Sequence, residues 1–209
     1  METIEIGKLL RAGTAGFVVG CSVSQFNEPM FGSLVRAPVY DGYDVFGVIQ
    51  DIHIDDDGLV RQLVTSTGQI SEEVLRDNRE RRIVPVEMSV ISVGYRRLGQ
   101  ISHSLPPQPP LSLDRIFQCS DEETRAFAGF GNYGYLRHIL RGQNTPIGEL
   151  VAAHLRLAAI AHGSKGDAWI GDAIRQLINE LRDDYQTLMD VLNSISEVLP
   201  SLENGQEER

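Results

Sequence analysis

The stretch SLVRAPVYDGYDVFGVIQDIHIDDDGLVRQLV, residues 33–64, holds three runs of mainly apolar residues separated by two turns. β-Branched and aromatic residues are frequent in these runs, as is typical of strands. Asp41-Gly42 and Asp57-Gly58 provide residues that tolerate the positive φ angles of tight hairpins. We therefore predict that the chain folds back on itself here as neighbouring strands, at residues 33–39, 44–54 and 59–64.

Two further segments extend the predicted sheet in both directions. FVVGCSVS (17–24) and IVPVEMSVISVGYRR (83–97) have strand composition, and the second should bend at Pro85, which has no N–H to donate. Between the strands, SEEVLRDNRERR (71–82) is typical of a short helix with Ser71 as its N-cap. Short connections and a long last strand indicate a small barrel.

The character of the chain changes at SLPPQPPLSL (104–113), which should run as an extended polyproline spacer. Helix signals follow it: Ser120 and Glu123 form a capping box, a short helix closes at Gly142, and Pro146 and Gly163 bound a longer helix. We predict an α+β fold with four parts: a small β-barrel at 1–103, a proline-rich linker at 104–115, a helical domain at 116–200 and a disordered tail at 201–209.

The last helix is predicted to run from about Asp167 to Leu199. Its apolar residues recur at steps of three and four, which indicates a coiled-coil seam with one extra four-residue step between Leu181 and Tyr185. We predict a homo-oligomer held largely by this helix, and an intramolecular bundle of three or four helices is the alternative. The seam residues are Ile170, Ile174, Leu177, Leu181, Tyr185, Leu188, Leu192, Ile195 and Leu199.

Composition and charge exclude several classes of partner. The chain has 19 basic and 29 acidic residues, a net charge of −10, so we expect it to bind neither nucleic acid nor an anionic membrane by itself. It has no apolar run long enough to cross a bilayer, and its acidic start lacks the apolar core of a signal peptide. We expect a cytoplasmic protein in which Cys21 and Cys119 are reduced and buried.

Metal and nucleophile motifs are missing from the sequence. An EF-hand loop ending at Gly58 would need an acid at position 53 and Glu at 64, where the chain has His53 and Val64. The five histidines (53, 103, 138, 154 and 162) include no i, i+4 pair, and no G-x-S-x-G motif is present. We therefore predict no metal, no cofactor and no catalytic residue.

Nucleotide-binding motifs are missing as well. The sole Gly-Lys pair, Gly7-Lys8, precedes leucine where a Walker A motif requires Ser or Thr. HGSKGD (162–167) and GFGNYG (129–134) lack the strand that would precede a phosphate-binding loop. The protein should neither bind ATP tightly nor hydrolyse it.

The segment GFVVGCSVSQFNEPMFGSLVRAPVYDGYDVFGVIQDI (16–52) resembles the HAS-barrel, the N-terminal β-barrel of HerA-type ATPases and of the rotary ATP synthase α and β subunits. RIVPVEMSVISVGYR (82–96) is similar to its closing strand, so the resemblance covers roughly residues 10–97. In HerA-type proteins a RecA-like motor with Walker motifs follows the barrel, whereas here the proline-rich segment and helices follow. The resemblance implies a barrel that supports assembly, contacts a partner nuclease and contributes no catalytic residue.

Two functions remain open at this point. The first is a non-enzymatic assembly or adaptor protein. It would self-associate through its last helix and would bind a HerA-type ATPase or the associated nuclease. The second is a small-ligand or nucleotide-binding protein or enzyme with a site between the two halves. Such a site would be built from scattered residues such as Arg36, His53, Arg61 and Glu87.

Overall fold

Seven strands form one antiparallel sheet in the computed structural model, which describes residues 4–22, 30–40, 42–54, 85–142 and 145–199. The strands follow the β-branched and aromatic runs of the sequence and end at glycine-containing turns. Their bounds are β1 Glu5–Ala12, β2 Gly16–Ser22, β3 Leu34–Tyr40, β4 Tyr43–Ile54, β5 Pro85–Arg97, β6 Gln100–Ser102 and β7 Arg115–Gln118.

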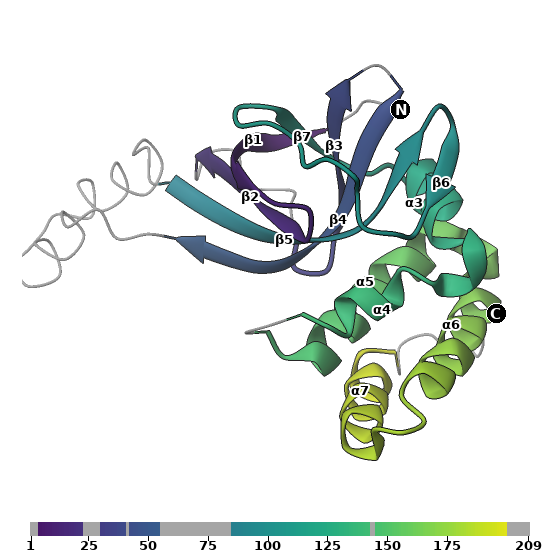
Figure 1. Ribbon diagram of the computed structural model, residues 1–209. Coiled ribbons are helices and arrows are strands. Elements are labelled where there is room, and N and C mark those ends of the chain that lie inside the picture. Colours follow the sequence, from purple (N-terminus) through teal and green to yellow (C-terminus); the bar gives the residue numbers. More distant parts are fainter. Residues whose placement is uncertain (1–3, 23–29, 41, 55–84, 143–144, 200–209) are drawn as a thin grey trace, which may run out of the picture.

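Six of these strands close into a barrel (Figure 1). Going around it, β1 pairs with β7, β7 with β3, β3 with β4, β4 with β5, β5 with β2, and β2 returns to β1. β6 lies outside this ring and pairs with the end of β5. The predicted N-terminal barrel is confirmed.

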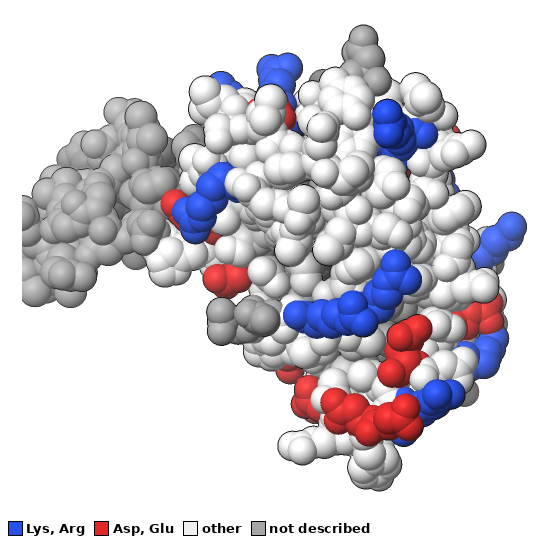
Figure 2. Space-filling model, in the orientation of Figure 1, with Lys and Arg blue, Asp and Glu red and all other residues white. Residues whose placement is uncertain are grey.

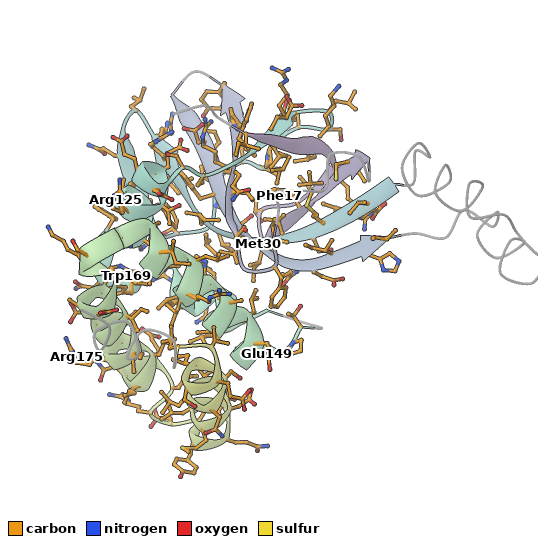
Figure 3. The ribbon with its side chains drawn as sticks, turned by 180° about the vertical axis from the view of Figure 1, so that it is seen from behind. Phe17, Met30, Arg125, Glu149, Trp169 and Arg175 are labelled. Carbon is orange, nitrogen blue, oxygen red and sulfur yellow. The ribbon has the colours of Figure 1, made fainter. Side chains whose placement is uncertain are left out.

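Two apolar clusters hold the molecule together. The first fills the barrel and includes Ile6, Phe17 and Val45. The second lies between the outside of the barrel and the helices, and it joins Phe46 and Val48 of β4 to the helical residues. β4 therefore buries both of its faces, which explains why its sequence lacks the polar alternation of a half-exposed strand. Figure 3 shows Phe17 within the barrel and Trp169 among the helices.

The predicted linker at 104–115 is wrong, and so is the prediction that helical structure begins at residue 116. Residues 115–118 form β7, which pairs with β1 and β3 and completes the barrel. The proline-rich segment before it lies along the barrel, where Tyr43 Oη donates to the carbonyl oxygen of Gln108 (2.9 Å). Further along, the N–H of Leu113 donates to the carbonyl oxygen of Leu9 (2.8 Å). The segment is thus a strap within the barrel domain.

Five α-helices follow β7 in the described part of the chain, and they gather on one side of the barrel (Figure 1). The capping box is confirmed, because the Glu123 N–H donates to Ser120 Oγ (3.2 Å) and the Ser120 N–H donates to Glu123 Oε2 (3.1 Å). The helix between Pro146 and Gly163 is confirmed as well. Bounds are α3 Asp121–Ala128, α4 Leu136–Ile139, α5 Ile147–His162, α6 Gly166–Glu180 and α7 Tyr185–Val198.

The prediction of one continuous final helix is wrong. Helix α6 ends before Leu181, and Asp184 starts α7 by accepting a hydrogen bond from the Thr187 N–H (3.2 Å). The break falls on the extra four-residue step of the apolar pattern. Helix α7 then packs against α5 so closely that a Cβ on Gly148 would lie 2.6 Å from Ser194 Oγ. Much of the expected seam is therefore covered within the chain, as the alternative arrangement proposed.

Some predicted elements lie outside the described residues, namely the strand at 59–64, the helix at 71–82 and the tail at 201–209. The structure also contains β1 and β6, which the sequence pattern did not indicate. Among the described helices, none combines the length and the apolar character needed to span a membrane.

Candidate functional site

Four charged side chains form a network where the barrel meets α3. Arg36 of β3 lies 2.7 Å from Glu123 through Nε and 3.5 Å from Asp44 through Nη1. Arg96 of β5 bonds Asp44 Oδ2 through Nη2 (2.7 Å) and lies 3.9 Å from Glu123. Two carboxylates thus face two guanidinium groups. All four side chains are largely buried, so the charges depend on one another for solvation.

Aromatic rings and a thiol surround this network. The Arg36 guanidinium lies over the Phe117 ring and that of Arg96 lies over Phe46, at 5.1 Å and 5.5 Å from the ring centres. Burial raises the pKa of the neighbouring Cys119 thiol well above its ordinary value, and the Glu123 carboxylate adds to the rise. The thiol is therefore protonated at neutral pH, which removes its nucleophilic form.

A second polar group, centred on His154 of α5, joins the helices to the barrel. His154 Nδ1 lies 2.9 Å from the carbonyl oxygen of Gly32, and Nε2 lies 3.0 Å from Tyr135 Oη. A carbonyl oxygen only accepts, so Nδ1 carries the proton and Nε2 accepts from Tyr135. Burial lowers the pKa of His154 to about 4, so the ring is neutral at pH 7.

Two more histidines occupy the same boundary. His103, just after β6, donates through Nε2 to the carbonyl oxygen of Phe127 (3.0 Å), and His138 donates to the carbonyl oxygen of His103 (2.8 Å). Arg137 donates to that same oxygen (2.6 Å). Burial lowers the pKa of both histidines. Their hydrogen bonds fasten the end of the barrel to α3 and α4.

Two hollows lie on the described surface, and the smaller one adjoins His154 and Cys119. One, of about 120 Å³, lies between the barrel and α3 and α5, and its lining includes Gln118, Cys119, Thr124 and His154. The other, of about 310 Å³, is an open depression on the barrel beside the β1–β2 hairpin, with Arg11 and Gln50 in its lining. Among the described residues, no group of three potential ligands could hold a metal ion.

The structure separates the residues proposed from the sequence for a shared site. Arg36 belongs to the charge network, whereas Glu87 lies opposite His53 on the β4–β5 ladder and pairs with exposed Arg11 (3.6 Å). Position 53 is nine residues along β4 from Asp44, about 30 Å at the rise of an extended strand. Arg61 lies outside the described residues. Arg36 therefore does not form one site with His53 and Glu87.

We call the boundary between the barrel and the helices, with its charge network and histidines, the junction. Its polar groups are bonded within the protein and are not free to react with a substrate. A catalytic cysteine requires a stabilised thiolate and a histidine free to take a proton. Cys119 has a raised pKa, and both ring nitrogens of His154 are already engaged. Sequence reasoning missed this arrangement because its members come from β3, β4, β5, α3 and α5, and their spacing along the chain follows no motif.

A different feature is exposed at the end of the barrel, on a surface that we call the barrel rim: Leu10, Tyr40, Leu98, Leu111 and Leu113. Hydrogen bonds connect its parts. The Leu98 N–H donates to the carbonyl oxygen of Gly42 (2.7 Å), next to Tyr43, which holds the strap at Gln108. Ser112 Oγ donates to the carbonyl oxygen of Leu10 (3.4 Å). The strap therefore links the two sides of the rim.

Two rim leucines also have unfavourable backbone angles. Leu98 has φ 48° and Leu113 has φ 73°, and their side chains are 81% and 74% exposed. The left-handed region costs a residue with a Cβ about 1–2 kcal/mol relative to the right-handed one. Glycine would avoid that cost, and an exposed leucine adds nothing to the core. Such outliers are typical of functional positions.

Comparison with models of protein families gives no match, and a search of curated proteins gives no match either.

Proposed function

We propose that this protein is a non-enzymatic assembly or adaptor protein that combines a HAS-like barrel with a helical module. Its partners are further copies of itself, through the C-terminal helical part, and a HerA-type ATPase or an associated nuclease in the cytoplasm. It requires no cofactor or metal and contacts neither nucleic acid nor membrane directly. The observation that carries the proposal is the barrel rim, where leucines in a costly backbone conformation face solvent.

The contrast between the junction and the rim supports this function. Between the barrel and the helices, arginines pair with carboxylates, and His154 is held by a backbone carbonyl and a tyrosine hydroxyl. At the rim, large apolar side chains are exposed to solvent in the described part of the chain. Exposed apolar surface of this kind stabilises a complex when a partner removes it from water. Both features are consistent with a protein that acts by forming a complex with other proteins.

The proposal is tested by light scattering on the full-length protein, measured first alone and then mixed with a purified HerA-type ATPase. We expect a mass that rises with protein concentration or a complex with the ATPase, and no ATP hydrolysis by the protein alone. The double variant Leu98→Ser, Leu113→Ser should weaken that association. A matched variant, Ile160→Ser on α5, should not, because Ile160 is exposed away from the rim. If the protein is monomeric and does not bind the ATPase, the proposal is contradicted.

The second candidate is a small-ligand binder, and the hollow of about 120 Å³ between barrel and helices favours it. Gln118 lines this hollow, and its buried Oε1 has no hydrogen-bond partner among the described residues. A ligand with an N–H or O–H group would satisfy this oxygen. A rise in melting temperature across a nucleotide and metabolite panel, lost in Gln118→Leu, supports this candidate, and a flat response contradicts it.

A further inference from the structure

The barrel rim carries positive charge beside its leucines. Lys8 and Arg97 are exposed and form no ion pair with a described residue. Arg115, opposite Lys8 on the β1–β7 ladder, pairs with Glu5 (2.9 Å). Asp114 is partly buried and accepts the Leu111 N–H (2.7 Å), while Asp41 lies outside the described residues. Among the described rim residues, two cations without an ion pair, Lys8 and Arg97, therefore stand against one such carboxylate, Asp114, and the excess charge is positive.

The turn between α6 and α7 has the opposite character, and we call it the helical tip: Glu180, Asp183, Asp184, Tyr185, Met189 and Asp190. Its four acidic residues are exposed, and its one basic neighbour, Arg182, lies beside Asp183 (3.4 Å). Tyr185 is 72% exposed. Met189 lies four residues later on α7, which places both side chains on the same helix face. The tip thus combines apolar side chains with excess negative charge.

The rim and the tip lie at opposite ends of the molecule. The β3–β4 and β5–β6 turns are at the top of Figure 1 and α7 is at the bottom, so one copy cannot bring its own rim to its own tip. In Figure 2, acidic side chains gather over the lower end, around α7. The two surfaces can meet only between copies.

We propose that the barrel rim of one copy binds the helical tip of a second copy, so that the protein assembles head to tail. This inference rests on the proposed self-association and names the two surfaces that carry it. Tyr185 and Met189 pack against the rim leucines, and the tip carboxylates lie against Lys8 and Arg97. Burial of the apolar side chains provides the affinity.

The charges select the head-to-tail arrangement. A rim–rim contact would bring cations together and a tip–tip contact would bring carboxylates together, and like charges at an interface are unfavourable. A contact between two different surfaces leaves a free rim at one end and a free tip at the other. It therefore continues into a ring or a filament. Because the attraction acts between exposed charges, rising salt should weaken it.

The test uses two full-length variants that each block one surface. The rim variant carries Arg97→Glu and Leu98→Ser, and the tip variant carries Asp183→Lys and Tyr185→Ser. All four side chains are exposed, so both variants should fold, which circular dichroism verifies. The matched control, Arg156→Glu with Ile160→Ser, changes the same kinds of side chain on α5, outside both surfaces.

Light scattering across the micromolar range should show assembly of the wild type and the control, and monomers for each variant alone. An equimolar mixture of the two variants should form a 1:1 dimer that grows no further, because the intact tip of one binds the intact rim of the other. A mixture that stays monomeric, a variant that still assembles alone, or a control that fails to assemble would overturn the head-to-tail contact. If one of these three results occurs although the wild type assembles, only the head-to-tail contact is wrong and the proposed function stands. A wild type that is monomeric and does not bind the ATPase contradicts both proposals.

Discussion

His154 and Gly32 are 122 positions apart in the sequence, yet His154 Nδ1 donates to the Gly32 carbonyl oxygen over 2.9 Å. The approach is close enough that a Cβ on Gly32 would lie 2.8 Å from the backbone nitrogen of His154, and Gly32 has φ 85°. This bond ties the middle of α5 to the chain just before β3. It makes the helices and the barrel depend on each other through a group that titrates.

Acid should weaken the protein through His154. Its folded pKa of about 4 lies below the ordinary 6.5, so the folded state binds fewer protons than the unfolded state. The stabilisation is therefore complete above pH 6.5 and is lost as the pH falls toward 4. By pH 5 the loss from this group should reach about 2 kcal/mol. Urea unfolding at a series of pH values measures it.

The variant His154→Gln isolates this effect, because an amide keeps one donor and one acceptor but does not titrate in this range. It should be less stable than the wild type at pH 7 and should lose less stability than the wild type between pH 6.5 and 5. His103 and His138 have lowered pKa values, so a smaller acid response should remain. Equal pH slopes in the variant and the wild type would contradict this account.

The Arg36–Glu123 pair should show energetic coupling. Glu123→Gln keeps the side chain's shape and capping capacity but leaves Arg36 with less compensating charge, so we expect a loss of about 1–3 kcal/mol. Arg36→Met should also destabilise the fold. The double variant should lose less than the sum, by about 1 kcal/mol or more, because the pair shares one interaction. Additive losses would show that Asp44 and Arg96 dominate the network.

The sequence predicted the parts of the fold that depend on local pattern, and it failed where distant residues decide. The strand runs around residues 33–54 and the Ser120 capping box depend on neighbours in the chain, and both are confirmed. Strand β7 is four residues long, and only its position between β1 and β3 makes it a strand. The charge network and the His154 bond likewise have no local signal, because their partners meet only in the folded chain.

Replacing Leu98 with glycine should stabilise the monomer. Glycine adopts φ 48° without the clash of a Cβ, and the exposed leucine gives up little packing, so we expect a gain of up to about 1 kcal/mol. Leu105→Gly is the matched control, since Leu105 is an exposed strap leucine without a positive φ, and it should be neutral or destabilising. Thermal unfolding of the two variants measures the difference. A less stable Leu98→Gly protein would show that the leucine supports the fold itself.

Barrel and helices should unfold in a single transition, because one apolar cluster contains β4 residues and helical residues together and β7 leads directly into α3. The fluorescence of the sole tryptophan, Trp169, reports on the helices. The far-ultraviolet circular dichroism band of β structure reports on the barrel. Both probes should give the same urea midpoint.

Ile116→Ala, which empties a fully buried position of β7, should lower both midpoints together by an amount equivalent to about 2–5 kcal/mol. Leu113→Ala, three residues earlier on the exposed strap, should change them little. If the Trp169 signal kept its midpoint while the barrel signal moved, the helices would be an independent domain and the proline-rich strap would act as the linker after all.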